Sequence, residues 1–262
     1  MTIESARQDR LARAVLFDLD DTLFDHRRAA RAALTELHSL HGRGIDLDAF
    51  ERQHATHLEV MHLEVLAGRL GLDEARRERF RRVFLAFGIG LDEGDVDAVA
   101  SAYRAGYMSA RRALDGAVDL LRAVRPHARI GIVTNNLLEE QQDKLAHCGL
   151  AALVDELVAS EDVGVSKPDR GIYDIALRRM DVAASAAVMV GDSWANDVAG
   201  AINAGIRAVW FNPDRKPAPG PPWGVAEIHA LAPARDVLPL LLGSPSPVDA
   251  GSGETGGERR SS

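Results

Sequence analysis

Residues 14–23 read Ala-Val-Leu-Phe-Asp-Leu-Asp-Asp-Thr-Leu, and this stretch decides the fold. An uninterrupted apolar run is typical of a parallel strand that is covered on both faces. Two carboxylates, Asp18 and Asp20, follow where the run ends. Ligands of open α/β sheets bind at the carboxyl ends of strands, and side chains two residues apart point the same way. Because like charges there require a cation or a shared proton, we expect a functional site, although an isolated Asp pair also suits an ordinary acidic loop.

Three later segments repeat the pattern of an apolar run that ends in polar groups. Residues 130–135 read Ile-Gly-Ile-Val-Thr-Asn, and residues 188–192 read Val-Met-Val-Gly-Asp. Asp197 lies five residues beyond the second of these runs, and Lys167 follows a candidate strand at 156–159. Only three of the 31 basic residues are lysines, so Lys167 is not readily explained as generic surface charge. Its compact ammonium group can approach a phosphate and a carboxylate together.

The order of helical and strand patterns predicts the architecture. Helices are expected at 26–40, 47–67, 73–87 and 92–110, and then at 116–125, 138–148, 169–180, 196–204 and 233–242. The later helices alternate with strands at 130–134, 156–159, 188–191, 208–211 and 227–229, which is typical of a doubly wound parallel sheet. We therefore expect an α/β core domain at 1–24 and 115–242, a helical insertion at 25–114, and a disordered tail at 243–262.

Composition restricts the compartment and the partners. The formal net charge of −8 disfavours binding to nucleic acid polymers or to an anionic membrane. Cys148 is the only cysteine, so no internal disulfide is expected. Residues 1–13 lack the apolar run of a signal peptide, and no stretch reaches the length of a membrane span. These features predict a cytoplasmic protein, and they leave open whether it is a monomer or a homodimer.

In order and content, the polar strand ends resemble the four motifs of the haloacid dehalogenase (HAD) superfamily. The matching segments are DLDDT at 18–22, IVTNN at 132–136, the lysine of VSKP at 165–168 and GDSWAND at 191–197. The resemblance spans roughly residues 14–211 and implies a Rossmann-like core with a type-1 helical cap at 25–114. Residues 132–212 look most like the pyrimidine 5'-nucleotidase branch and are also similar to phosphatases that act on flavin mononucleotide.

The resemblance implies a phosphoric monoester hydrolase that uses Mg²⁺ and acts on a small soluble phosphate ester. Asp18 matches the nucleophile, which forms an aspartyl phosphate, and Asp20 matches the general acid and base. Asp18 and Asp192 would be carboxylate ligands of Mg²⁺, and the main-chain carbonyl of Asp20 would be another ligand. Asp197 would support the ion indirectly or through water. Lys167 would bridge the nucleophile and the phosphate.

Further residues are expected to contact the substrate. Thr134 and Asn135 would donate hydrogen bonds to the transferring phosphoryl group. The family often has glycine after this pair, so Asn136 would alter the pocket near the leaving group. His26 and Arg27 follow the first motif, where the resemblance places a hinge, and they are candidate substrate contacts.

The histidines are concentrated in the helical insertion, where six of the nine lie between residues 26 and 62. A zinc site would require a closed set of nitrogen or sulfur ligands, and no cysteine lies nearby. These histidines are therefore expected to be solvated or to face the substrate. His62 and Arg69 are additional candidates for substrate contacts.

Three other functions remain open. A 2-haloacid dehalogenase would use the same nucleophile, but a halide leaves without protonation, so Asp20 disfavours this alternative. A phosphotransferase or mutase acting on a sugar phosphate would form a phosphorylated product with a bisphosphate activator. A non-enzymatic binding protein on this fold would be expected to lack at least one of Asp18, Asp20, Lys167 and Asp192, and all four are present.

Overall fold

The computed structural model describes residues 12–42, 44–219 and 224–243. In this part of the chain, six parallel strands form one sheet in the order β3-β2-β1-β4-β5-β6. The strands are β1 (Ala14–Phe17), β2 (Arg129–Thr134), β3 (Glu156–Ala159), β4 (Ala187–Gly191), β5 (Arg207–Phe211) and β6 (Ala226–Ile228). The predicted doubly wound α/β fold is therefore confirmed, with β1 and β4 side by side in the middle of the sheet.

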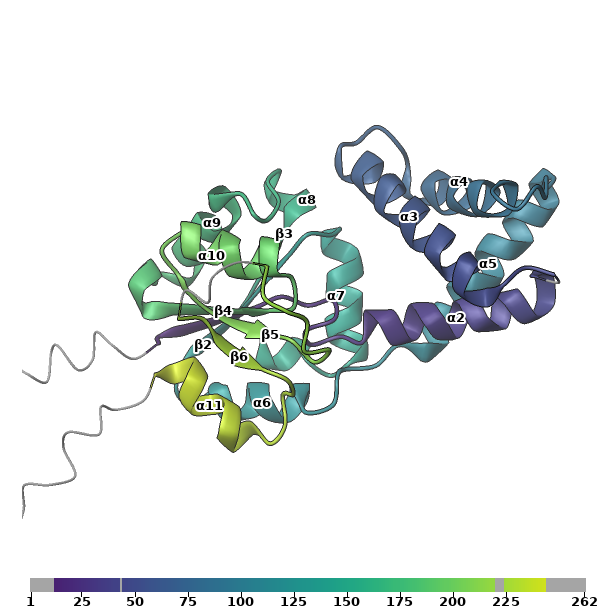
Figure 1. Cartoon of the computed structure of the whole chain (residues 1–262). Coiled ribbons are helices and arrows are strands. Elements are labelled where there is room, and N and C mark those ends of the chain that lie inside the picture. Colours follow the sequence, from purple (N-terminus) through teal and green to yellow (C-terminus); the bar gives the residue numbers. More distant parts are fainter. Residues whose placement is uncertain (1–11, 43, 220–223, 244–262) are drawn as a thin grey trace, which may run out of the picture.

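Helices cover both faces of this sheet (Figure 1). They are α6 (Ala117–Val124), α7 (Leu138–His147) and α11 (Ala234–Leu242) for one hydrophobic core, and α9 (Arg170–Met180) and α10 (Gly200–Asn203) for the other. Alternate residues of a strand enter opposite cores, as for Val15 and Leu16. All of β1 is buried for this reason, and its sequence reads as a continuous apolar run.

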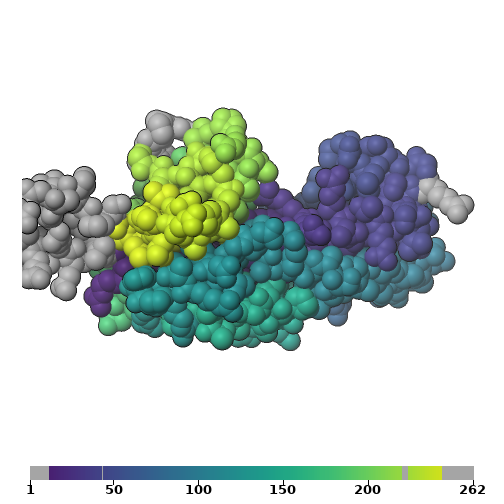
Figure 2. Space-filling model, turned by 90° about the horizontal axis from the view of Figure 1, so that it is seen from below, coloured from purple at the N-terminus to yellow at the C-terminus, as the bar shows by residue number. Residues whose placement is uncertain are grey.

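Four helices lie between β1 and β2 in the chain, and we call them the inserted helices. They are α2 (His26–His41), α3 (Leu47–Leu66), α4 (Leu72–Leu85) and α5 (Glu93–Ala110). The side chains of Asp25, Asp46 and Asp92 accept hydrogen bonds from the first turns of α2, α3 and α5 and so cap these helices. Figure 2 shows the blue residues of this region as a lobe at one end of the molecule.

Two adjacent chain segments connect the inserted helices to the sheet. The Leu114 amide donates to the Leu23 carbonyl at 2.8 Å, and the Asp25 amide donates to the Arg112 carbonyl at 3.1 Å. The outgoing and returning segments are thus hydrogen-bonded to each other close to the end of β1. The division of the chain into two domains at residues 25 and 114 stays a prediction.

The main difference from the expected elements follows β4. The helix expected at 196–204 begins earlier, as a π-helical segment at Trp194–Ala199, and α10 continues it. The hydroxyl of Ser193 accepts a hydrogen bond from the Asn196 amide and so fixes this earlier start. A short helix, α8 (Ser160–Val163), was not expected. Most of the predicted tail, residues 244–262, lies outside the described residues, and none of the described helices is both long and apolar enough to cross a membrane.

Candidate active site

The turn after β1 presents the first pair of acids. The Asp18 amide still donates to the Val190 carbonyl at 2.9 Å, so Asp18 continues the sheet. The chain then turns sharply, and the Leu19 carbonyl accepts hydrogen bonds from the amides of Leu23 and Phe24. Asp21 takes a left-handed conformation with φ of 60°, which Asp tolerates better than most residues. Asp18 is consequently buried at the sheet end, whereas Asp20 reaches the surface of a cavity.

Lys167 lies between two buried carboxylates. Its Nζ is 2.7 Å from Asp18 Oδ1 and 2.7 Å from Asp197 Oδ1. The side chain of Asn135 fixes the main chain of Lys167, because its Nδ2 donates to the Lys167 carbonyl at 2.8 Å and its Oδ1 accepts from the Lys167 amide at 2.7 Å. The ends of β1, β2 and β4 and the loop that carries Lys167 therefore meet at one point.

Three carboxylates converge next to this lysine. Oxygens of Asp18, Asp192 and Asp197 lie within 4.8 Å of one another. Burial raises the pKa of Asp18 well above its ordinary value although Lys167 opposes the shift, and Asp197 adds to it. Burial, followed by the negative charge of Asp197, raises the pKa of Asp192 to about 6. This excess of negative charge and the all-oxygen donor set fit a hard divalent cation such as Mg²⁺.

The carboxylate of Asp192 also contacts Arg27. The Nη2 of Arg27 is 2.6 Å from Asp192 Oδ2, and its other nitrogens reach Asp21 at 3.1 Å and Asp214 at 3.0 Å. Arg27, a predicted substrate contact, therefore lies among acidic side chains in this structure. The main chain of Asp192 is held by hydrogen bonds with Thr22 and Trp210.

Asp20 has a separate set of partners. Lys144 Nζ is 2.6 and 2.8 Å from the two carboxylate oxygens, and Asp20 Oδ2 also accepts from Gln141 at 3.0 Å and from Asn136 at 3.2 Å. Burial alone would raise the pKa of Asp20, but the nearby charges of Lys144 and His26 hold it below its ordinary value. The sequence did not indicate Lys144 or Gln141 as site residues. Lys144 is also one of only three lysines, but it lies within α7 and not after a strand end, so the argument applied to Lys167 did not extend to it.

Thr134, the last residue of β2, and Asn135 both form hydrogen bonds to other residues of the site. Thr134 is 2% exposed, and its Oγ1 accepts a hydrogen bond from Gln141 at 3.2 Å. Because that bond occupies an acceptor position only, the Thr134 hydroxyl proton stays available to a phosphoryl oxygen. The side chain of Asn135 bonds the main chain of Lys167 with its Oδ1 and one Nδ2 hydrogen, so its predicted hydrogen bond to the phosphoryl group through the other hydrogen stays a prediction.

The histidines of the inserted helices differ in environment. His26 Nδ1 is 2.9 Å from the Tyr107 hydroxyl, and His62 Nε2 is 3.0 Å from a main-chain oxygen in the loop after β2. His54 is only 2% exposed and lies between aromatic rings of α4 and α5. The expectation that these histidines are solvated or face the substrate is therefore wrong for His54, because helical spacing did not reveal that its position faces the core.

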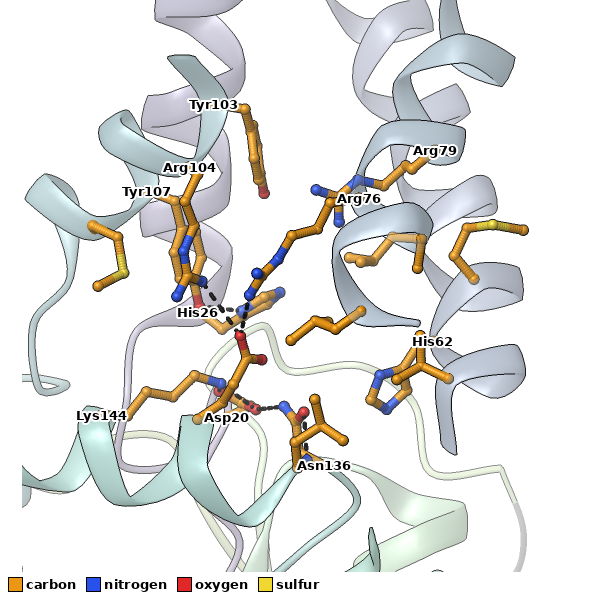
Figure 3. A pocket seen from close by; sticks show the side chains of 18 of the residues that line it. Asp20, His26, His62, Arg76, Arg79, Tyr103, Arg104, Tyr107, Asn136 and Lys144 are labelled. Atoms are coloured by element: carbon orange, nitrogen blue, oxygen red, sulfur yellow. Dashed lines mark hydrogen bonds and ion pairs between the residues drawn. The ribbon is translucent and has the colours of Figure 1, made fainter. Parts of the chain in front are cut away.

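A cavity of about 260 Å³ separates the sheet end from the inserted helices. Its lining includes Asp20, Asn136 and Lys144 on the sheet side, and residues of α2, α3, α4 and α5 on the other. Figure 3 shows Asp20 at the lower end of this cavity, below side chains that extend from α4 and α5. A ligand in the cavity would contact the first motif and the inserted helices simultaneously.

Comparison with known proteins identifies the family. The family model described as haloacid dehalogenase-like hydrolase matches residues 12–205. The chain belongs to this family, as its motifs indicated. It is similar to the pyrimidine 5'-nucleotidase YjjG of Escherichia coli, with 43% identity over 122 residues, which cover 45% of this chain and 54% of that protein. The match thus spans about half the length of that relative.

Two longer matches extend the comparison. The ribulose-1,5-bisphosphate 5-phosphatase of Halopiger xanaduensis is 32% identical over 211 residues, covering 79% of this chain and 87% of that protein. The chain is also similar to the crystal structure of the putative HAD-hydrolase YfnB of Bacillus subtilis bound to magnesium. The TM-score is 0.69 and the sequence identity 27%, and the match covers 87% of this chain and 99% of that one. The enzyme class expected from the sequence, a phosphoric monoester hydrolase, agrees with the nucleotidase and phosphatase among these relatives.

Proposed function

We propose that this protein is a Mg²⁺-dependent phosphatase that hydrolyses a small soluble phosphate monoester through an aspartyl phosphate on Asp18. One observation carries the proposal: Asp18 lies 2.7 Å from Lys167 and within 4.8 Å of two more carboxylates, all supplied by distant segments. A phosphate dianion repels a carboxylate nucleophile, so attack requires positive charge at this point. Lys167 supplies one such charge. Mg²⁺, held by Asp18, Asp192 and the carbonyl of Asp20 with Asp197 in support, would supply the remainder.

Each of these side chains has a separate role in the proposed reaction. An oxygen of Asp18 attacks phosphorus while Asp20 gives a proton to the departing alkoxide, a proton that Asp20 must first take up in the substrate complex against the opposing charge of Lys144. Asp20 next removes a proton from water, which hydrolyses the aspartyl phosphate and releases inorganic phosphate. Thr134 donates a hydrogen bond to the transferring group. We infer that the inserted helices act as a cap that excludes bulk water from this step and selects the organic group.

Nucleoside 5'-monophosphates and flavin mononucleotide are the first substrates to test, because residues 132–212 resemble the branch that handles them. The dehalogenase alternative has no need for the acid two residues after the nucleophile. A phosphotransferase would reveal itself by a phosphorylated organic product where a hydrolase releases inorganic phosphate.

The test is a phosphate-release screen with Mg²⁺ over nucleotides, sugar phosphates and flavin mononucleotide, repeated with excess chelator. We expect turnover that chelator abolishes and added Mg²⁺ restores. Asp18→Asn should lower turnover at least about 1,000-fold, because it removes the nucleophile. The fold should persist, because Asp197 still pairs with Lys167 at 2.7 Å. Asp119→Asn is the matched control, since Asp119 is 80% exposed on α6. Retained turnover in Asp18→Asn, or hydrolysis insensitive to chelator, would refute the proposal.

A further inference from the structure

The end of the cavity away from Asp20 carries surplus positive charge. Arg76, Arg79 and Arg104 line it from α4 and α5 (Figure 3). Arg76 and Arg104 both donate to Oε1 of Glu140, at 2.5 and 3.3 Å. Arg76 also pairs with Asp73 at 2.9 Å, so Glu140 and Asp73 are the carboxylate partners of Arg76 and Arg104, and neither is within ion-pair distance of Arg79.

Arg79 is the guanidinium left without a counter-charge. The residue is 8% exposed, and across residues 12–42, 44–219 and 224–243 it makes no hydrogen bond and no ion pair. Its Nε is fully buried without a partner. Its guanidinium carbon lies 5.0 Å from the ring centroid of Phe80 and 4.9 Å from that of Tyr103. Such ring contacts and the more distant charge of Glu140 recover only part of the cost of removing a cation from water, so the protein compensates the charge of Arg79 incompletely.

We propose that Arg79 forms a second anion-binding subsite, which binds a carboxylate or a second phosphate on the same phosphate ester that is hydrolysed at Asp18. This inference rests on the proposed function, because it concerns the far end of that substrate. A guanidinium presents paired donors that match carboxylate and phosphate oxygens. Asp20 and Arg79 line the same cavity, so one small molecule can contact both ends. Leu58, Met61 and Val65 also line this cavity and offer apolar contacts to the carbon skeleton of such a molecule.

The alternative is that Arg79 only packs against the aromatic rings and that the cavity binds an uncharged group such as a nucleobase. The two possibilities differ in which substrates depend on Arg79. If Arg79 binds an acidic group, its loss impairs only substrates that carry one. If Arg79 is a packing residue, its loss affects every substrate alike through the fold.

The experiment compares substrates that differ in the second acidic group. One pair is 3-phosphoglycerate with glycerol 3-phosphate, which tests a carboxylate; the other is fructose 1,6-bisphosphate with fructose 6-phosphate, which tests a phosphate. We expect the wild type to prefer the more acidic member of at least one pair by about 10- to 100-fold in kcat/KM, the range of a charged hydrogen-bonded contact. Arg79→Gln should abolish this preference and leave p-nitrophenyl phosphate hydrolysis within about twofold.

Two further variants make the result decisive. Arg79→Lys keeps the charge without the paired donors, so part of the substrate preference should survive. This variant also tests the subsite if Arg79→Gln does not fold. Arg82→Gln is the control, since Arg82 lies on the same helix, pairs with Glu78 and is 43% exposed. It should leave the preference unchanged.

The outcomes separate this inference from the function on which it rests. If the wild type hydrolyses p-nitrophenyl phosphate but shows no preference in either pair, or if the preference persists in Arg79→Gln, the subsite is refuted and the phosphatase stands. If no phosphate ester is hydrolysed, the proposed function fails. Calorimetric binding of 3-phosphoglycerate and of fructose 1,6-bisphosphate, each to Asp18→Asn with and without Arg79→Gln, then tests the subsite without turnover. Loss of binding of either acidic ligand in the double variant supports the subsite, and equal binding of both refutes it.

Discussion

At the scale of single residues, the contact between Lys144 and Asp20 is expected to contribute measurably to folding. Both side chains are largely buried, and Lys144 Nζ contacts both oxygens of the carboxylate. Lys144→Met should lower the free energy of unfolding by about 1–3 kcal/mol, because it leaves the partly buried carboxylate of Asp20 without its ion-pair partner. Urea unfolding of Lys144→Met, Asp20→Asn and the double variant measures the coupling energy. Lys216→Met, at an exposed ion pair, is the control; additive effects in the cycle would contradict the coupling.

The same contact shows what residue-level reasoning could and could not predict. Asp18, Lys167 and Asp192 follow recognisable strand ends, so the sequence placed them at one edge of the sheet. Lys144 lies within a helix, where helical spacing alone does not show that it reaches the strand end. Arg79 likewise reads as one of many arginines on α4, and its missing partner is a property of the packed structure. The role of a residue that depends on its tertiary neighbours cannot be predicted from the local sequence pattern.

At the scale of secondary-structure elements, the packing of α3 against α4 and α5 depends on a neutral His54. Burial, followed by the positive charge of Arg79, lowers the pKa of His54 well below its ordinary value, and His26 and His57 contribute. The His54 ring also contacts Phe80 and Tyr103. The folded state therefore resists protonation of His54, whereas the unfolded chain accepts a proton near pH 6.5.

This difference gives a stability prediction with a definite sign. Below about pH 6.5 the unfolded state binds a proton that the folded state does not, so stability falls as pH falls, by up to about 1.4 kcal/mol per pH unit from this group. His54→Phe, which fits the aromatic surroundings, should remove that part of the slope. Chemical unfolding between about pH 5 and 7.5 measures the difference, with His127→Gln as the control at an exposed position outside the inserted helices. Equal slopes for wild type and His54→Phe would contradict the assignment.

The elements themselves were largely predictable, for physical reasons. The central strands are buried on both faces, so their apolar runs have clear ends, and aspartate caps mark the start of three inserted helices. The segment after β4 was less predictable because a π-helical turn is fixed by the local Ser193 cap and not by a hydrophobic period. Which face of α3 is buried also required the positions of α4 and α5.

At the scale of the whole molecule, we expect the acid cluster to couple folding to the binding of a divalent cation. Asp18 follows the first strand, whereas Asp192 and Asp197 follow the fourth, and only folding brings their oxygens within 4.8 Å. Without a cation, these three carboxylates share Lys167 as their close positive partner, apart from the partly exposed Arg27 at Asp192. A cation that binds the folded chain, and not the unfolded one, must raise the free energy of unfolding.

Mg²⁺ at 100 times its dissociation constant should add about 2.7 kcal/mol to that free energy, which corresponds to a rise of roughly 5–10 °C in the unfolding midpoint for a chain of this size. Asp192→Asn should reduce the rise, and it should increase the midpoint in chelator because one of the mutually repelling charges is gone. Asp236→Asn, 68% exposed on α11, should respond to Mg²⁺ as the wild type does. Thermal unfolding with and without Mg²⁺ measures all three. A wild-type midpoint that stays constant up to about 10 mM Mg²⁺ would show that the acids converge without holding the ion, and the metal-dependent step of the proposed reaction would lose its structural basis.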